Sequence, residues 1–375
     1  MCDVPALRFP EFTDEWMPKT INDLATVLGG GTPDTTIKSY WDGNIQWFTP
    51  SEIGKSKYVS LSSRTITEDG LNNSSAKLLP SYTILLSSRA TVGECSITLH
   101  ECATNQGFQS LIAKNCDIDF LYYLIQTKKK DLIRKACGST FLEISANEVR
   151  KIRTNVPSNT EQKKIGALLS LIDKRIETQN KIIEDLRLLR DAISVCLLSP
   201  KSDWKCYKVS EIADIGRGRV ISSKEIANQN NPRYPVYSSQ TSNEGIMGYL
   251  DDYAFDGEYI TWTTDGANAG TVFYRNGRFN CTNVCGTLKL HYQFDAYYCS
   301  LVLANATKKY VSVNLANPKL MNNTMAAIKL YLPPFQEQKR MPQLFRKMDE
   351  NITLEHKLLL SYQKQKYYLL QQMFI

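Results

Sequence analysis

Apolar residues recur at spacings of three and four over one long stretch, from Val156 to Leu198. This is the period of an apolar stripe along one face of an α-helix, so the pattern predicts a single long helix. The stripe positions are Ile165, Leu168, Ile172, Ile176, Gln179, Ile183, Leu186, Arg190, Ile193 and Leu197. A helix of about 40 residues spans roughly 60 Å, far more than a typical globular helix, so it needs a partner along its length.

The end of the chain carries a second copy of this stretch. V-P-S-N-T-E-Q-K-K-I from Val156 is matched by L-P-P-F-Q-E-Q-K-R-M from Leu332, with Glu161 on Glu337 at an offset of 176 residues. The same offset repeats the stripe as Met341, Leu344, Met348, Ile352, Glu355, Leu359, Tyr362, Lys366, Leu369 and Met373. Both stripes are interrupted by polar residues at the same two places. We therefore expect the two helices to pair with each other.

The polar stripe positions suggest a register for this pairing. If the helices run antiparallel and paired residue numbers add up to 545, Arg190 meets Glu355 and Gln179 meets Lys366. The apolar pairs are then Ile183 with Tyr362, Leu186 with Leu359, Ile176 with Leu369, and Ile193 with Ile352. A shift by one heptad would bury Ile183 against Glu355 or Leu186 against Lys366, which costs an unpaired charge. The prediction is an intramolecular antiparallel coiled coil; the alternative is two amphipathic helices packed on different cores.

The segments that precede the two helices also resemble each other. W-M-P-K-T-I-N-D-L-A-T-V-L-G-G-G from Trp16 is echoed by W-K-C-Y-K-V-S-E-I-A-D-I-G-R-G-R from Trp204, and each predicts a short helical turn, a strand and a Gly-rich loop. A-T-N-Q-G-F-Q-S-L-I from Ala103 is echoed by C-T-N-V-C-G-T-L-K-L from Cys281. Such short β-branched and aromatic runs, broken by Gly, Asn and Ser, predict a compact and mostly antiparallel β region. Helical passages follow at 120–137 and 296–310.

The repeated order of elements predicts an α+β protein with a pseudo-twofold internal repeat. Two mixed, β-rich domains alternate with two long helices: residues 1–155 form the first domain, 156–200 the central helix, 201–331 the second domain and 332–375 the C-terminal helix. Pro342 lies inside the second helix pattern, where proline removes a backbone hydrogen bond, so the regular helix should begin near it. Ser158 and Glu161 predict a capping box for the first helix.

Composition narrows the class of protein. The chain has 375 residues, 42% hydrophobic, and a formal charge of +7, which permits binding to a polyanion without demonstrating it. It has no run of about 18 apolar residues and no apolar segment near its start, so we expect neither a membrane span nor secretion. The ten cysteines include no C-x-x-C pair and the three histidines lie far apart, which favours reduced thiols in the cytoplasm over a zinc site.

Several motifs resemble parts of catalytic or ligand sites, but none is complete. Gly54-Lys55-Ser56 lacks the upstream glycine of a phosphate-binding loop, and D-I-G-R-G-R from Asp214 lacks the third glycine of a nucleotide fingerprint. Leu332-Pro333-Pro334-Phe335 lacks the Asn or Asp that a catalytic N-P-P-Y motif places first. No set of nucleophile, base and orienting residue is visible. We therefore expect a protein that is not an enzyme and has no metal or cofactor.

Four kinds of motif occur in a fixed order around the two helices. They are the P-x-x-x-E-Q-K helix starts at Pro157 and Pro333, G-G-G-T-P from Gly29 with Y-W-D-G-N-I-Q-W-F-T-P from Tyr40, S-S-R-A-T-V-G from Ser87, and T-N-Q-G from Thr104. With these motifs, nearly the whole chain resembles a specificity subunit of a type I restriction–modification system.

The resemblance implies two target recognition domains, each reading one half of a bipartite DNA sequence. The helices would set the distance between half-sites and dock two modification subunits, which hold the methyl donor, while separate restriction subunits cleave. A coiled coil of roughly 40–60 Å suits half-sites about one or more DNA turns apart, at roughly 34 Å per turn. The alternatives are a self-contained DNA methyltransferase with its own recognition domain, or a scaffold whose two domains bind proteins rather than DNA.

Candidate DNA contacts follow from residue type and position. Phosphates favour Lys, Arg and backbone N–H groups, while base edges favour Arg, Asn, Gln, Ser and Thr. In the first domain these are Lys38, Tyr40, Arg64, Lys77, Arg89, Asn105, Gln106, Ser139 and Thr140. In the second they are Arg217, Arg219, Ser238, Ser239, Gln240, Asn243, Thr264 and Asn283. For each, the alternative is a solvated loop residue or a turn former. The lysine run 128–130 is more typical of a solvated helix face than of a phosphate contact.

Overall fold

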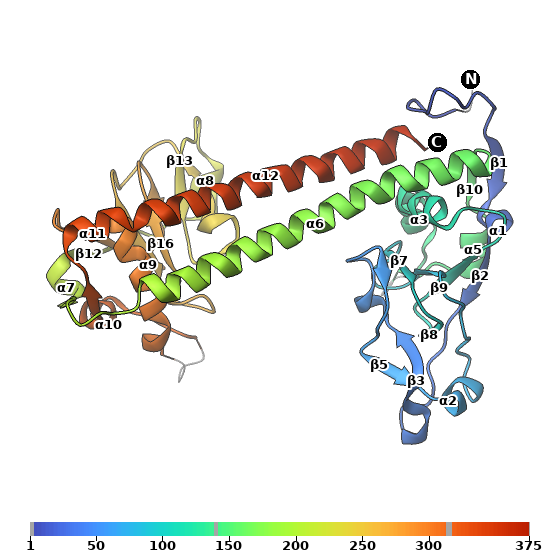
Figure 1. Cartoon of the computed structure of the whole chain (residues 1–375), viewed down its shortest axis with the longest axis horizontal. Helices are drawn as coiled ribbons and strands as arrows, with labels where there is room; N and C mark the ends of the chain where they lie inside the picture. The colour runs from blue at the N-terminus through green and yellow to red at the C-terminus, as the bar shows by residue number, and fades with distance from the viewer. Residues whose placement is uncertain (1–3, 139–141, 313–316, 375) are drawn as a thin grey trace. The chain divides into compact units, whose positions relative to one another are not determined.

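The computed structural model describes residues 4–138, 142–312 and 317–374, so the predicted contacts Ser139 and Thr140 lie outside the described residues. The chain divides into two compact units (Figure 1). The first comprises Met1–Ile182 and His356–Ile375, and the second comprises Ile183–Glu355. Each unit therefore contains one β-rich domain and one end of each long helix. The four-segment division predicted from the sequence cuts the chain differently and stays a prediction.

The β-rich domain of the first unit is built from three sheets. The five-stranded sheet has the order β2 (Ala25–Gly29), β9 (Gln109–Ala113), β6 (Ile84–Leu86), β7 (Cys95–Thr98), β4 (Tyr58–Val59). The three-stranded sheet has the order β5 (Arg64–Ile66), β3 (Trp41–Phe48), β8 (Cys102–Thr104), and β1 (Met17–Thr20) pairs with β10 (Arg153–Val156). The helices are α1 (Ile21–Leu24), η1 (Lys38–Tyr40), η2 (Pro50–Glu52), α2 (Glu68–Asn72), α3 (Ile118–Thr127), α4 (Lys129–Lys135) and α5 (Ala146–Arg150).

The second unit repeats this topology. Its four-stranded sheet has the order β12 (Ala213–Arg217), β18 (Cys285–Leu290), β15 (Tyr259–Thr263), β16 (Val272–Arg275), and its three-stranded sheet the order β14 (Ile246–Leu250), β13 (Tyr234–Tyr237), β17 (Asn280–Cys281). Strand β11 (Lys205–Lys208) pairs with β19 (Lys329–Leu332). The helices are α7 (Val209–Ile212), α8 (Ser223–Ala227), η3 (Ser242–Gly245), α9 (Ala296–Ala306), η4 (Thr307–Tyr310) and α10 (Asn322–Ala327). The predicted duplication is thus visible in the order of strands.

Both domains are mostly antiparallel, as expected, but each contains one equivalent parallel pair. Strand β3 runs parallel to β8, and β13 runs parallel to β17. Strands β4 and β7 form a further parallel pair in the first domain. The two equivalent pairs matter for function, because the carboxyl ends of parallel strands meet at the same edge of a sheet.

Each unit has its own apolar core, centred on the helix that follows the large sheet. In the first unit Phe120 of α3 packs edge-on against Trp16, which is 3% exposed, and stacks on Phe374. In the second unit Tyr298 of α9 packs in the core with Trp204, which is 6% exposed. The tryptophans that open the two repeats therefore serve the same purpose, which explains why the sequence places them at equivalent positions.

The long helices begin where the sequence predicts. Helix α6 spans Asn159–Leu197, whereas the second copy is split into α11 (Phe335–Arg340) and α12 (Pro342–Gln372) next to the proline. The capping box is only half present. Ser158 Oγ accepts the N–H of Glu161 at 3.4 Å, but the Glu161 carboxylate binds Arg8 instead of the cap backbone. All twenty stripe positions are described, and among them only Leu344 is exposed.

The two charged stripe residues have other ion-pair partners than the predicted Glu355 and Gln179. In the first unit Lys366 Nζ of α12 lies 2.7 Å from Asp173 of α6, and in the second unit Arg190 Nε of α6 lies 2.6 Å from Asp349 of α12. The residue numbers of each pair add up to 539 rather than 545. The predicted register rests on the cost of leaving Arg190 or Lys366 unpaired when one helix shifts along the other. Two aspartates outside the apolar stripe remove that cost, because each reaches the opposite helix.

Two glycines at equivalent positions allow a close backbone crossing. A Cβ on Gly30 would clash with the carbonyl oxygen of Asn105, and a Cβ on Gly218 would clash with that of Cys281. We expect Gly30→Ala to lower the free energy of unfolding by about 1–3 kcal/mol, the usual cost of overpacking. Urea unfolding measures this. Gly29→Ala is the matched control, since its nearest neighbours are 3.8 Å away, and an equal loss in both variants would contradict the prediction.

Candidate nucleic-acid interface

Four strand ends meet at one edge of the first domain. Three backbone hydrogen bonds join the loops after β2, β3, β6 and β8: Gly31 N–H to Thr104 O at 2.8 Å, Asn105 N–H to Phe48 O at 3.1 Å, and Ser88 N–H to Gly107 O at 2.8 Å. We call this set of loops the first loop edge. The parallel pairing of β3 with β8 places two of the four ends side by side, so residues far apart in sequence form a single face.

The second domain has an equivalent edge, the second loop edge, formed by the loops after β12, β13, β15 and β17. It is held by Arg219 N–H to Cys281 O at 3.2 Å, Thr282 N–H to Tyr237 O at 2.9 Å, and Thr264 N–H to Val284 O at 2.9 Å. The same four strands of the repeat therefore supply both edges. Because the loop sequences differ, the two edges present different side chains on the same backbone plan.

The predicted contacts of the first domain fall into two groups. Asn105, Gln106 and Arg89 lie on the first loop edge: Asn105 Oδ1 accepts the Gly107 N–H at 2.9 Å and Gln106 is exposed, accepting from Thr32 Oγ1 at 2.5 Å. Arg89 is bound to Glu143 at 2.6 Å, so it is not a free cation. The other described residues of this prediction lie on or beside the three-stranded sheet. Lys38, Arg64 and Lys77 are exposed, and Tyr40 is half-buried.

Arg64 is the best-placed cation of that second group. Its guanidinium carbon lies 3.6 Å from the ring centre of Trp41 and 5.6 Å from that of Trp47. Trp41 and Trp47 are both buried and pack edge to face. Stacking on an aromatic face fixes the plane of the guanidinium while the side chain stays exposed. Arg64 therefore presents its N–H donors to solvent in a fixed plane.

In the second domain, two of the predicted contact residues make hydrogen bonds within the protein. Thr264 is fully buried and its hydroxyl donates to Val284 O at 3.0 Å. Arg217 is exposed, but its guanidinium donates to Asn283 O at 2.7 Å and to Thr264 Oγ1 at 3.0 Å. It thereby ties the loops after β12, β15 and β17 together. Residue type alone does not separate a DNA contact from this role, because Arg and Thr side chains also hold loops in place.

Arg219 and Asn283 remain exposed on the second loop edge. Arg219 pairs with Glu225 at 2.5 Å, and the hydrogen bond with this carboxylate raises the pKa of Arg219. Ser238, Ser239 and Gln240 are half-buried and Asn243 is exposed. Ser238 Oγ accepts from Thr282 Oγ1 at 3.2 Å, which links the loop after β13 to that after β17.

The loop 238–245 is strained and is held by a residue that the sequence did not reveal. Asn243 and Glu244 have φ of 49° and 53°, a left-handed conformation that is unfavourable for residues other than glycine. Arg275 Nη2 donates to Glu244 O at 2.6 Å, while its guanidinium stacks 3.6 Å from the ring centre of Tyr237. Arg275 is 5% exposed, and burial lowers its pKa. A lone arginine ending an apolar strand carries no sequence signal for this role.

Lysines follow the equivalent helices α3 and α9 in both domains. Lys129 and Lys130 begin α4, and Lys308 and Lys309 lie in η4; Lys130, Lys308 and Lys309 are exposed. Both groups border an equivalent turn, because a Cβ on Gly93 would touch the Lys129 side chain and Thr307 Oγ1 donates to Gly270 O at 2.8 Å. Each turn directly follows the strand that leads into a loop edge, so the lysines extend both edges with positive charge.

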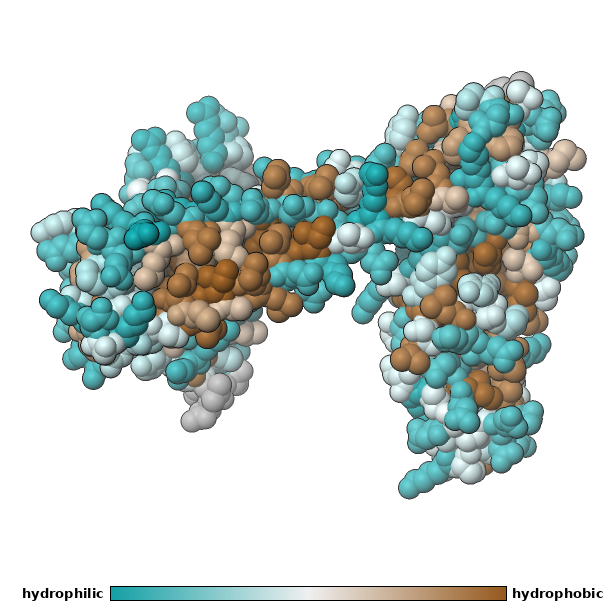
Figure 2. Space-filling model, in the orientation of Figure 1, coloured by the Kyte–Doolittle hydropathy of each residue, from teal (hydrophilic) through white to brown (hydrophobic). Residues whose placement is uncertain are grey.

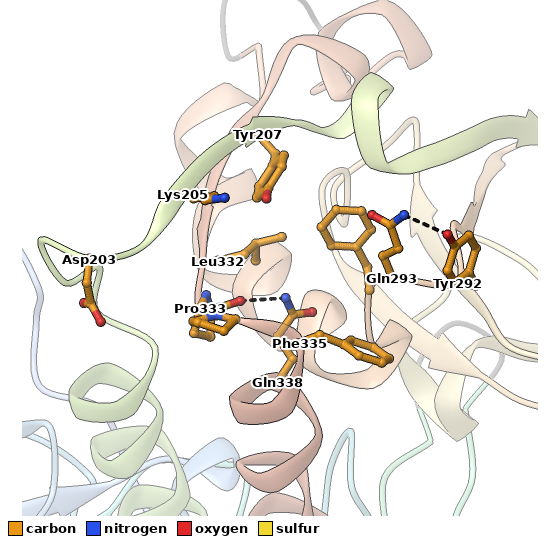
Figure 3. Close-up of a pocket in the computed structure, with 11 residues that line it drawn as sticks. Asp203, Lys205, Tyr207, Tyr292, Gln293, Leu332, Pro333, Phe335 and Gln338 are labelled. Carbon is orange, nitrogen blue, oxygen red and sulfur yellow. Dashed lines mark hydrogen bonds between the residues drawn. The ribbon is translucent and has the colours of Figure 1, made fainter.

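A pocket lies at the start of α11 in the second unit. It is lined by Asp203, Lys205, Tyr207, Tyr292, Gln293, Phe294, Leu332, Pro333, Pro334, Phe335 and Gln338. Gln338 Nε2 donates to Pro333 O at 2.8 Å across the helix entry (Figure 3). The described residues that line it include no serine, cysteine or histidine. The incomplete P-P-F motif forms the entry to α11.

No cluster of three or more His, Cys, Asp or Glu side chains in residues 4–138, 142–312 and 317–374 could hold a metal ion. No helix within those ranges is both long and apolar enough to cross a membrane.

The fold and the two loop edges define the class of protein: an internal duplication that presents two related but unlike faces. The model of one family, the type I restriction modification DNA specificity domain, matches residues 13–188 and again residues 201–372. These two matches take up most of the chain, so the chain belongs to the type I restriction–modification DNA specificity family.

Individual relatives agree with this assignment. The specificity subunit of the type I restriction enzyme MjaIX of Methanocaldococcus jannaschii is 39% identical over 182 residues, which are 46% of this chain and 42% of that subunit. A putative type I specificity subunit of Mycoplasma pneumoniae, S.MpnORF289P N-terminus, is 50% identical over 128 residues, 34% of this chain and 67% of the relative. The alignment thus spans less than half of the MjaIX subunit.

A solved structure shares the fold. The crystal structure of the type I restriction–modification S subunit from M. genitalium superposes with a TM-score of 0.63, covering 99% of both chains at 18% sequence identity. At this level of identity the likeness concerns the fold alone. It shows that the order of β-rich domain, long helix, β-rich domain and long helix is an architecture known from solved structures.

Proposed function

We propose that this chain is the sequence-specific DNA-binding specificity subunit of a type I restriction–modification complex. Each β-rich domain is a target recognition domain that reads one half of a bipartite site, and the chain itself is not an enzyme. The observation that carries the proposal is the pair of loop edges: one backbone plan, used twice, with different side chains. A single duplex with two unlike half-sites is the ligand that such a pair matches.

The side chains of the loop edges suit this ligand. Asn105 and Gln106 on the first edge, and Asn283 with Ser239 on the second, are the residue types that hydrogen-bond base edges in the major groove. Arg64, Lys130, Lys308 and Lys309 surround these edges with positive charge, which suits phosphates. The remaining predicted residues, Lys38, Tyr40, Lys77, Arg219, Ser238, Gln240 and Asn243, are proposed contacts of the same kind.

The two long helices act as the spacer in this proposal, paired as an intramolecular antiparallel coiled coil. Support comes from two ion pairs between α6 and α12, one in each unit, whose residue numbers give the same sum: Lys366 with Asp173, and Arg190 with Asp349. Stripe residues are buried within each unit, for example Ile172 with Leu369 in the first core. A rod formed from both repeats would hold two recognition domains at a set distance on DNA.

The outer faces of the helices are the proposed dock for two modification subunits, with restriction subunits joining them. Apolar side chains that point away from the seam are exposed in both units: Leu171, Leu360, Tyr367 and Tyr368 in the first, and Leu188, Leu189, Val195 and Leu354 in the second. Brown side chains gather along α6 in the second unit (Figure 2). Exposed apolar side chains in such number mark a surface that another protein covers. The complex would work in the cytoplasm, where DNA and reduced thiols are found.

The proposal is tested by mapping methylated bases in the genome of the source cell with and without this chain. We expect methylation at a bipartite sequence that disappears when the chain is deleted. Replacing residues 201–331 by the corresponding segment of another family member should change one half of that sequence and leave the other half unchanged. Unchanged methylation after deletion, or a change in both halves after the exchange, would contradict the proposal.

Neutralising Lys308 and Lys309 should weaken DNA binding without changing its sequence preference. Removing one phosphate contact reduces the slope of log affinity against log salt by about 0.9, so the slope of the double Gln variant should fall by up to roughly 1.8. Fluorescence anisotropy on cognate and scrambled duplexes at several salt concentrations measures both quantities. Lys201→Gln with Lys224→Gln removes the same charge away from η4 and serves as the control. An unchanged slope would assign the lysines to a solvated surface.

A further inference from the structure

We propose that Asp173 and Asp349 are positioning residues that fix each recognition domain to the helices and so determine which spacer length between half-sites is accepted. This inference rests on the proposed function and names the residues that give it its geometric selectivity. Two equivalent groups of three side chains carry it, one in each unit.

In the first unit, Asp173 of α6 joins three elements. It accepts a hydrogen bond from Tyr123 Oη of α3 at 2.6 Å and pairs with Lys366 Nζ of α12 at 2.7 Å. Tyr123 is fully buried, and the side chains of Asp173 and Lys366 are only 18% and 21% exposed. One carboxylate therefore connects the domain, its own long helix and the opposite long helix.

The second unit has the same arrangement. Asp349 of α12 accepts a hydrogen bond from Tyr297 Oη of α9 at 2.6 Å and receives Arg190 Nε of α6 at 2.6 Å. Burial acts to lower the pKa of Arg190, but the hydrogen bond and charge of Asp349 outweigh it, so the pKa is raised. The offset of 176 relates Asp173 to Asp349 and also Arg190 to Lys366. The pseudo-twofold repeat thus reproduces both the carboxylate and its cation.

The two tyrosines occupy different positions in the repeat, so the sequence duplication alone does not account for both hydrogen bonds. Tyr123 is six residues after Asp117, which caps α3, whereas Tyr297 is two residues after Asp295, which caps α9. They come from different turns of equivalent helices, yet both hydroxyls reach the equivalent aspartate. Two unlike domains have therefore arrived at the same attachment, as expected if the attachment itself is needed.

Each domain is also attached to the start of its long helix. With this second attachment in place, the one at the aspartate determines the orientation of the domain. Gln162 Oε1 accepts the Asp117 N–H at 3.0 Å in the first unit, and Gln338 Oε1 accepts the Asp295 N–H at 3.2 Å in the second. Each Gln lies eleven residues before the aspartate of the same repeat, Asp173 or Asp349, which is about 16 Å along α6 in the first unit. A domain held at one point can pivot, while two points this far apart fix its direction. Removing the attachment at the aspartate should free the pivot.

The test uses the full chain in complex with its modification subunits, on duplexes whose two half-sites are separated by the preferred spacer or by one or two base pairs more or fewer. Tyr123→Phe and Tyr297→Phe each remove one hydroxyl and keep the ring. We expect the preference for the correct spacer to fall at least about tenfold in each variant, while the base preference within both half-sites is retained. A loss of base preference equal to the loss of spacer preference would overturn the inference.

Tyr298→Phe is the matched control, because Tyr298 is buried on the same helix and its hydroxyl has no partner among the described residues. Lys366→Arg copies the cation of the second unit and should keep the spacer preference, whereas Lys366→Gln should relax it and replaces Tyr123→Phe if that variant does not fold. Wild-type spacer preference in both Phe variants would sink the inference and leave the proposed function standing. A wild-type complex indifferent to the bipartite sequence would instead sink the proposed function.

Discussion

Replacing Arg8 by alanine should lower the free energy of unfolding of the first unit by about 3–5 kcal/mol. The Arg8 guanidinium donates two hydrogen bonds to the Glu161 carboxylate, at 2.7 and 2.8 Å, and Glu161 is 1% exposed. Removing one partner of a buried ion pair leaves an uncompensated charge, which costs about 3–5 kcal/mol. The free energy of unfolding of the first unit, followed by urea denaturation, measures this loss.

The second repeat supplies the control for this prediction. Glu337 is equivalent to Glu161 but is exposed and has no ion-pair partner among the described residues. Glu337→Gln should therefore change the unfolding free energy by no more than about 0.5 kcal/mol. Combining Arg8→Ala with Glu161→Gln removes the unpaired charge and should recover part of the stability. If the double variant is as unstable as Arg8→Ala alone, the loss comes from packing and the electrostatic explanation is wrong.

The contrast between Glu161 and Glu337 also shows what a repeated sequence can predict. The E-Q-K motif correctly located two equivalent helix starts, because helix periodicity and the preceding proline are local signals. The sequence could not indicate that one glutamate is buried under the segment around Arg8 while its equivalent is exposed. That difference depends on which distant segment covers each helix start, and no spacing within the motif encodes it.

The helix register illustrates a second limit. The stripe from Ile165 to Leu197 was readable because apolar burial repeats with the helix period, and its members are buried or half-buried as expected. The ion-pair partners of Arg190 and Lys366 differ from the predicted ones because stripe periodicity points only to other stripe residues. Asp173 and Asp349 lie beside the stripe, and side chains long enough to cross the seam make such flanking positions equal candidates.

The loop edges were predicted in part for a related reason. Asn105, Gln106 and Asn283 were identified because the repeated T-N motif follows a strand in both domains. The burial of Thr264 was not predicted, because residue type does not distinguish a hydroxyl that faces solvent from one that holds a loop. Burial is decided by the whole domain, so only the three-dimensional arrangement separates these two roles.

Replacing Arg275 by methionine should weaken recognition of one half-site and leave the other intact. Arg275 holds Glu244 O within a loop whose Asn243 and Glu244 backbones are strained. Methionine fills similar volume against Tyr237 but cannot donate, so the loop should relax away from its recognition geometry. Removing one base contact costs about 1–3 kcal/mol of discrimination, so we expect selectivity in the second half-site to fall roughly 10–100-fold. Binding to duplexes with single base changes in either half-site measures it.

Arg278→Met separates this effect from a change in charge. Arg278 lies three residues further along the chain and is half-exposed. It pairs with Asp256 at 3.1 Å and lies over the ring of Tyr253, whereas Arg275 contacts loop 238–245. Its replacement removes the same charge and should leave base discrimination in both half-sites unchanged, since an exposed ion pair contributes little. The first half-site provides a second reference within the Arg275→Met protein itself. Equal losses in the two half-sites would mean that Arg275 supports overall folding, whereas a loss confined to the second would assign it to the loop that reads that half.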